Sequence, residues 1–169
     1  STGTFSPGFT RLAIAEFARN RILVVDVDKD ERLATGRLAL KGCVELSSRQ
    51  FHSPHGLRFL DDETIIVANR EGDTLILPVP PRGSTATHHE VSPVQAIRPG
   101  WRRPKFTPGS VAVLSATPSQ TEVLVCNNYQ NSLSRYLLDR RRDYRVRSSQ
   151  LLLQKRLDVP DGVAVTSDG

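Results

Sequence analysis

The sequence Ser53-Pro54-His55-Gly56-Leu57-Arg58-Phe59 places a proline one or two residues before a short apolar segment, and the same pattern returns twice. The second copy is Thr107-Pro108-Gly109-Ser110-Val111-Ala112-Val113, and the third is Val159-Pro160-Asp161-Gly162-Val163-Ala164-Val165. The prolines stand 54 and 52 residues apart. A nearly constant period of this length is typical of repeat proteins, in which each repeat is one supersecondary unit.

The residues that follow each turn predict short β-strands, because β-branched and apolar residues lie between turns rich in Asp, Glu, Gly and Pro. In the middle copy we expect strands at 56–60, 64–69, 73–78 and 94–97. The next copy predicts strands at 110–114, 122–127, 132–138 and 145–153. A weaker first copy predicts strands at 11–16, 21–27, 31–35 and 38–46. Turn signals interrupt the apolar pattern too often for α-helices.

Four short antiparallel strands in each repeat of about 50 residues predict an all-β fold, a β-propeller of four-stranded blades. One such sheet cannot bury both of its faces, so tandem blades pack against their neighbours. We expect an extension at 1–10, blades at about 11–46, 54–97 and 108–153, and the first strand of a further blade from 160. Because propellers have about four to eight blades, we expect further chain or dimerisation to complete this one.

The composition is that of a soluble globular protein. The 169 residues are 38% hydrophobic and 24% charged, and no apolar run approaches the length of a membrane-spanning helix. The chain contains no methionine, and its third copy stops at Gly169. We therefore expect it to be part of a longer polypeptide with no membrane span.

The net charge of +5 comes mainly from arginine, and it raises the question of nucleic-acid binding. Residues 101–106 interleave basic and aromatic side chains, and Arg140, Arg141 and Arg142 form a second basic cluster. Such groups can contact a phosphate backbone or stack on a base. A nucleic-acid-binding protein usually concentrates its charge on one face. This excess is spread along the chain, so we do not expect a nucleic-acid partner.

The repeat resembles a known group of β-propeller families. The motif Pro54-His55-Gly56-Leu57-Arg58-Phe59, followed by Ile66-Val67-Ala68-Asn69 and Gly72-Asp73-Thr74-Leu75, is similar to the consensus of NHL and YVTN repeats. The resemblance covers about residues 50–169 well and 11–46 weakly, and Ser110 departs from it where the other copies carry glycine. It implies a propeller. Such families include gluconolactonase-like hydrolases, lyases and protein-binding scaffolds, so the fold alone does not choose an activity.

The loops before the first strand of each blade are the candidate functional positions. In a propeller the first strands line the central channel, so His55, Ser110 and Asp161 are expected around one opening. We expect Ser110, Asn69 and Asn127 to contact a ligand. Imidazole and carboxylate groups also bind Zn²⁺ or Ca²⁺, which makes His55 and Asp161 candidate metal ligands. In the structural alternative, His55 and Asp161 only hydrogen-bond the backbone of their turns.

Two functions follow from this arrangement. We expect a scaffold that binds a protein or a small molecule at the channel mouth or the loops, because the loops vary while the strands repeat and no complete catalytic constellation is visible. The alternative is a metal-assisted, lactonase-like hydrolase or lyase. Under that alternative His55 is a catalytic base or metal ligand, and Asp161 is a metal ligand.

Overall fold

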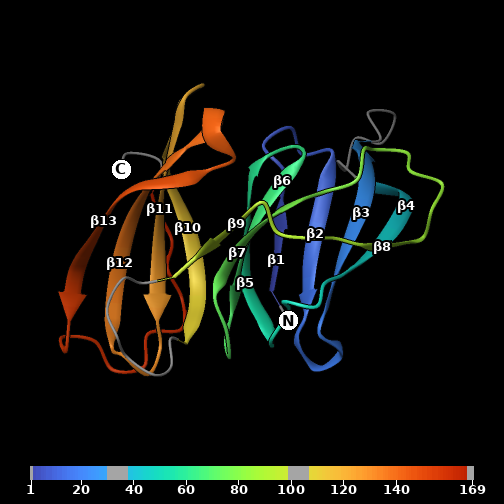
Figure 1. Ribbon diagram of the computed structural model, residues 1–169. Helices are drawn as coiled ribbons and strands as arrows, with labels where there is room; N and C mark the ends of the chain where they lie inside the picture. Colours follow the sequence, from blue (N-terminus) through green and yellow to red (C-terminus); the bar gives the residue numbers. More distant parts are fainter. Residues whose placement is uncertain (1, 30–37, 99–106, 167–169) are drawn as a thin grey trace.

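The computed structural model describes residues 2–29, 38–98 and 107–166, and its regular structure is almost entirely β (Figure 1). The first sheet has the order β1-β2-β3-β4-β8, formed by β1 (Thr2–Phe5), β2 (Arg11–Glu16), β3 (Arg21–Lys29), β4 (Leu38–Ser47) and β8 (His88–Glu90). The second sheet is β5 (Pro54–Asp61), β6 (Thr64–Asn69), β7 (Thr74–Pro78) and β9 (Gln95–Ile97). The third is β10 (Pro108–Ala116), β11 (Gln120–Asn127), β12 (Ser132–Asp139) and β13 (Arg145–Gln154).

The expected all-β fold is confirmed, and the strands of the second and third sheets coincide closely with the expected ones. Both sheets are antiparallel throughout. Two short 3-10 turns, η1 (Phe17–Arg19) and η2 (Arg140–Arg142), join strands. No helix in the described part of the chain is long and apolar enough to cross a membrane.

The first sheet differs from the expected four antiparallel strands. Thr2–Phe5, expected to be an extension, form β1, which pairs antiparallel with β2. His88–Glu90 form β8, which pairs in parallel with β4 although it lies between β7 and β9 in the chain. The strand expected at 31–35 lies outside the described residues, as does the basic-aromatic segment at 101–106. The first sheet therefore has five strands, with β8 at its outer edge.

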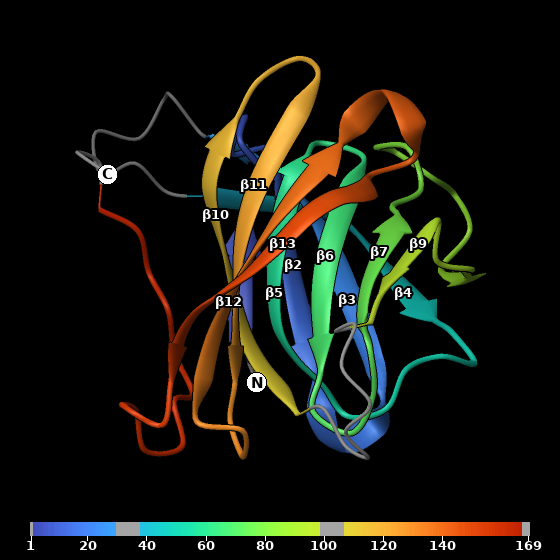
Figure 2. The same ribbon diagram turned by 60° about the vertical axis from the view of Figure 1, so that its left-hand side comes forward.

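The start of the third copy does not form the expected strand. Residues 160–166 have no regular secondary structure, and Figure 2 shows the chain after β13 turning and then running beside the third sheet. The amide of Val163 donates to the Ser110 hydroxyl at 3.3 Å, and the amide of Val159 donates to Oδ1 of Asn131 at 2.9 Å. A strand needs a neighbouring strand to pair with, and these backbone donors bond side chains of the third sheet and its turns instead.

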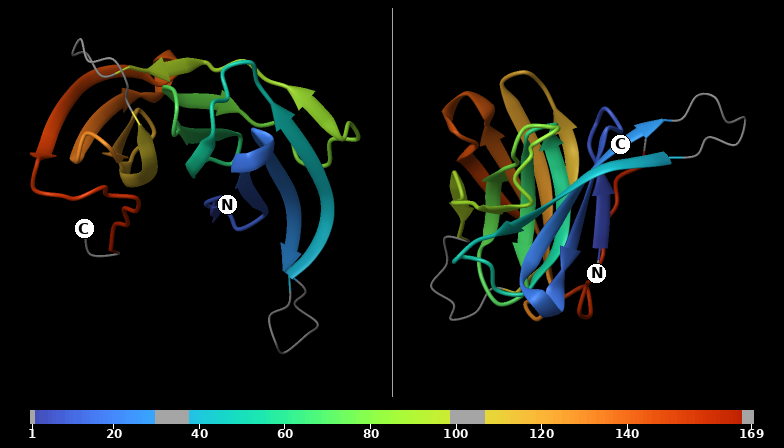
Figure 3. Two further views of the ribbon diagram at one scale, coloured as in Figure 1. Left: turned by 90° about the horizontal axis from the view of Figure 1, so that it is seen from below. Right: turned by 90° about the vertical axis from the view of Figure 1, so that its right-hand side faces the viewer.

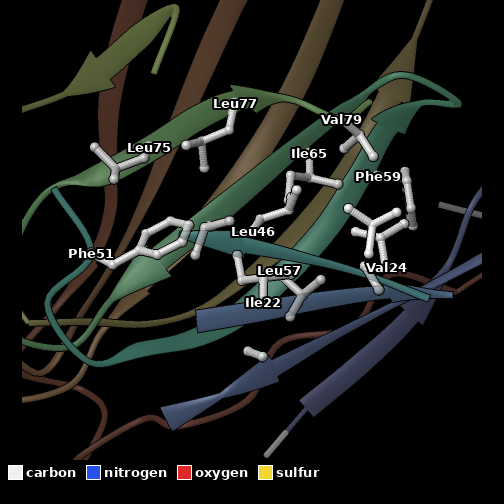
Figure 4. Close-up of a cluster of buried hydrophobic side chains, with 14 residues drawn as sticks. Ile22, Val24, Leu46, Phe51, Leu57, Phe59, Ile65, Leu75, Leu77 and Val79 are labelled. Carbon is white, nitrogen blue, oxygen red and sulfur yellow. The ribbon is translucent and has the colours of Figure 1, made fainter. Parts of the chain in front are cut away.

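The three sheets stand side by side in an arc, with β1, β5 and β10 on its inner side and β8, β9 and β13 on its outer side (Figure 3). The second sheet contributes to two apolar cores. Ile65 of β6 lies in the core shared with the first sheet, and the next residue, Ile66, lies in the core shared with the third. This follows from the alternation of side chains along a strand. Figure 4 shows the first core around Leu46, Phe51 and Leu57.

The Pro-x-Gly turns bring the inner strands of the second and third sheets into close contact. A Cβ atom added to Gly56 would lie 2.6 Å from the carbonyl oxygen of Gly109 and 2.6 Å from Cα of Ser110. Both distances are too short for a side chain, so only glycine permits this approach of β5 to β10. Gly56 therefore permits the close spacing between the second and third sheets at the inner side of the arc.

Candidate functional site

Four polar side chains, from the second sheet, the third sheet and the segment after β13, meet at one end of the inner strands. His55 lies on β5, Arg70 follows β6, Asn128 follows β11, and Asp161 lies in the segment after β13. Arg70 and Asn128 both donate to Oδ1 of Asp161, and the charge of His55 acts on the same carboxylate. We call His55, Arg70, Asn128 and Asp161 the mouth cluster.

His55 is fixed by backbone and aromatic contacts. Its Nδ1 lies 2.8 Å from the carbonyl oxygen of Gly109, and because a carbonyl only accepts, Nδ1 carries the proton. The hydroxyl of Thr2 donates to the His55 carbonyl oxygen. The Phe17 ring meets the imidazole edge-on, with 6.1 Å between ring centroids. In the neutral ring Nε2 is therefore the unprotonated nitrogen, which can accept a hydrogen bond or bind a metal.

Asp161 is an ionised carboxylate bound by donors from two sheets. Its Oδ1 accepts from Nδ2 of Asn128 at 2.7 Å and from Nη2 of Arg70. Burial opposes ionisation of Asp161, but the hydrogen bonds from Asn128 and Arg70, with the charges of Arg70 and His55, outweigh it and lower the pKa of this carboxyl. The cluster therefore stabilises negative charge at this position.

Asn128 is the most buried member of the cluster, with 1% of its surface exposed. A Cβ atom added to Gly109 would lie 1.8 Å from Oδ1 of Asn128, so the amide group sits directly against the backbone of β10. That oxygen has no hydrogen-bond partner among the described residues. Packing therefore holds the Asn128 amide in place, with its Nδ2 turned to Asp161.

The structure gives Ser110, Asn69 and Asn127 contacts within the protein. The Ser110 hydroxyl accepts from the amide of Val163. Asn69 is fully buried and binds the chain around its turn, accepting from the amide of His52 and donating to the carbonyls of Gln50 and Asp73. Asn127 donates to the hydroxyls of Ser132 and Ser134 within its own hairpin. The expectation that these three residues contact a ligand stays a prediction.

Sequence reasoning placed His55 and Asp161 at one opening and missed Arg70 and Asn128. A signal was present, because each of these residues directly follows the asparagine that ends the second strand of its repeat, as Asn69-Arg70 and Asn127-Asn128. Equivalent positions in a repeat occupy equivalent places in space. The residue that follows the asparagine at the end of this strand could therefore have been assigned to the same end of the molecule as His55.

The metal site expected at His55 and Asp161 stays a prediction. Within residues 2–29, 38–98 and 107–166, no three side chains of His, Cys, Asp or Glu lie together as a metal-binding group. Asp161 instead binds the cationic Arg70, and a metal cation at the same carboxylate would be repelled by that guanidinium. The mouth cluster is better suited to an anionic or hydrogen-bonding ligand than to a cation.

Comparison with known proteins gives evidence about the fold of this chain. Neither the models of protein families nor the curated proteins contain a match to this sequence. Among solved structures, a chain described as Kuenenia stuttgartiensis hydrazine synthase is similar, with a TM-score of 0.53 and 14% sequence identity. The similarity covers 89% of this chain and 36% of that chain. It supports the β-rich fold, and this chain spans about a third of the length of the protein it matches.

Proposed function

We propose that this chain forms three successive blades of a β-propeller of the NHL or YVTN type, with a ligand-binding mouth at the mouth cluster. The arc of three sheets and the two cores on either side of the second sheet support the blade assignment. The glycine contact between β5 and β10 supports it further, because propeller blades approach most closely at their first strands. Hydrazine synthase chemistry is not part of the proposal, since a fold can carry unrelated activities.

The binding role rests on one observation. The carboxylate of Asp161 is bound by Arg70, from the turn after β6, and by Asn128, from the turn after β11. Donors from two sheets thus converge on one point at the inner side of the arc, where His55 also lies. Convergent polar groups of this kind are typical of ligand sites. We propose that the scaffold binds a small molecule or a partner protein there, through groups that accept hydrogen bonds.

The alternative of a metal-assisted hydrolase or lyase has weaker support. His55 offers Nε2 as a base or ligand, but Asp161 is bound by a guanidinium. Elemental analysis of the purified protein for Zn²⁺ and Ca²⁺ tests this alternative, together with lactonase and lyase assays of His55→Ala. A bound metal that is lost in His55→Ala would favour the enzyme over the scaffold.

Completion of the propeller is the remaining part of the proposal. Leu133 and Leu137 lie on the face of β12 that points away from the second sheet, opposite Tyr136, and both are only partly buried. Leu12 and Ile14 lie in the same way on the outer face of β2. Apolar sheet faces are stabilised by packing against another sheet. We propose that further sheets, from further chain or from a second copy, cover these faces.

The binding proposal is tested by NMR on the imidazole of His55. A panel of metabolites and peptides is added to the protein, and the ring signals of His55 are followed against those of His88, which is exposed on β8 at the outer edge of the first sheet. Ligands of the mouth should shift His55 and not His88, and should lose affinity in His55→Ala while binding His88→Ala normally. Ligands that shift only residues of the outer strands would overturn the proposal.

A further inference from the structure

The mouth cluster already contains a carboxylate, and that carboxylate belongs to the chain itself. We infer that Arg70 and Asn128 form a binding site for a small organic carboxylate, and that Asp161 occupies this site in the ligand-free protein. The inference rests on the proposed function, because it names the chemical class of ligand that the mouth binds. The geometry of the Arg70, Asn128 and Asp161 side chains supports it.

Arg70 has more hydrogen-bond donors than Asp161 occupies. Its Nη2 donates to Asp161, while its Nε is buried and has no partner among the described residues. The Nε–H and the adjacent Nη2–H of a guanidinium point the same way and bind the two oxygens of one carboxylate side by side. A free carboxylate could use both donors. It would leave no buried donor unpaired, which is favourable because an unpaired buried donor carries a desolvation cost.

Asn128 supplies a preformed third donor. Its side chain is buried against Gly109, so the position of Nδ2 does not depend on Asp161 for its packing. A donor that is already ordered lowers the entropy cost of binding. In its protonated form His55 would add positive potential, because the charge of that form lowers the pKa of the carboxyl that sits in the site. A carboxylate in place of Asp161 would then experience the same field.

Asp161 is placed so that it can leave the site. About half of its side chain is exposed, at 53%. The segment on either side is anchored separately, by Val159 to Asn131 and by Val163 to Ser110. Rotation of the Asp161 side chain therefore frees the site without detaching the segment. An entering ligand competes with a tethered group, which predicts weak binding in the native chain and tight binding once Asp161 is removed.

The test uses acetate as the probe, acetamide as its neutral analogue and sodium chloride at equal ionic strength as the salt control. Calorimetry and NMR should show that Asp161→Ala binds acetate at least tenfold more tightly than the native protein, and that acetamide does not bind. Asp158→Ala removes an exposed carboxylate from the same segment and should behave as the native protein does. Adding Arg70→Ala to Asp161→Ala should abolish acetate binding.

Equal acetate affinity in Asp161→Ala and the native protein would overturn the inference, as would full binding after Arg70 is removed. In the native protein, acetate should shift the Arg70 Nε–H signal, which provides a readout if Asp161→Ala does not fold. No shift up to high acetate concentration would count against the site. If neutral ligands shift His55 while acetate does not, the carboxylate class is wrong and the binding mouth stands. If nothing shifts His55, the proposed function fails as well.

Discussion

Nδ1 of His55 donates to the carbonyl oxygen of Gly109 across 2.8 Å and so joins the first strand of the second sheet to the first strand of the third. The two residues occupy the same place, directly after the proline, in successive copies of the motif. The imidazole is therefore oriented by the next repeat and not by its own turn. This contact places the imidazole where the second and third sheets meet.

A side chain at Gly109 is expected to displace the amide group of Asn128. In Gly109→Ala the new Cβ would lie 1.8 Å from Oδ1 of Asn128, which must move and release Asp161. Overpacking of a buried contact costs about 1–3 kcal/mol in the free energy of unfolding. Urea unfolding measures this loss. Gly162→Ala is the matched control, because a Cβ there meets nothing within 4 Å, and its change should stay within about 0.5 kcal/mol. Equal effects of the two substitutions would contradict the packing at Gly109.

The middle strand of the second sheet should stabilise both of its interfaces. Ile65 and Ile66 are each fully buried, in the cores shared with the first and the third sheet respectively. Truncating either to alanine should lower the free energy of unfolding by about 2–5 kcal/mol, from lost burial and the cavity left behind. Leu40→Ala is the control, since Leu40 is 71% exposed. A large loss for one isoleucine and none for the other would show that the second sheet packs on one side only.

Tyr144 should make stability fall at alkaline pH. Its hydroxyl donates to Asp61 of the second sheet. Burial, and then the hydrogen bond and charge of Asp61, raise the pKa of Tyr144 to about 12. A tyrosine in the unfolded chain titrates near 10. Its contribution is therefore complete below about pH 10 and is lost between about pH 10 and 12.

Tyr144→Phe should remove that pH dependence. It keeps the ring but loses a hydrogen bond to a charged group, at a cost of about 1.5–3 kcal/mol below pH 10. Unfolding midpoints measured at several pH values give both effects. Tyr129→Phe, at a position 71% exposed, should change neither. If the native and Tyr144→Phe proteins lose stability in parallel above pH 10, Tyr144 is not the cause of the alkaline pH dependence.

Asp161 should make the stability of the fold decrease at acid pH, whereas Tyr144 makes it decrease at alkaline pH. Because its folded pKa is lowered, its contribution is present above its ordinary titration range near 4 and is lost as the pH falls through the folded pKa. The side chain is half exposed, so the contribution is under about 1 kcal/mol. Asp161→Asn should be slightly less stable than the native protein at pH 6, and the difference should vanish towards pH 2. Asp158→Asn should show no such trend, and a difference independent of pH would contradict the ion pair.

Strands that carry an apolar period were predictable, and those that depend on distant pairing were not. The segment at 64–69 alternates β-branched residues between two turns and forms β6 as expected. His88–Glu90 have no apolar period and are strand only because β4, over 40 residues earlier in the chain, offers a free edge. Residues 160–166 carry the motif but pair with no strand in the described part of the chain. Local pattern therefore predicted which segments can be strands, and pairing decided which of them are.

The amino-acid sequence alone determined the repeat and the all-β fold, because these depend on period and propensity, and it predicted the grouping of His55 with Asp161. Only the tertiary structure showed that Arg70 and Asn128 hold Asp161, and that Asn69 and Asn127 bind their own turns. The reason is that a hydrogen bond depends on the position and direction of a few atoms. Those are set by how closely two sheets approach, at Gly56 and Gly109, and not by the residues of either sheet alone.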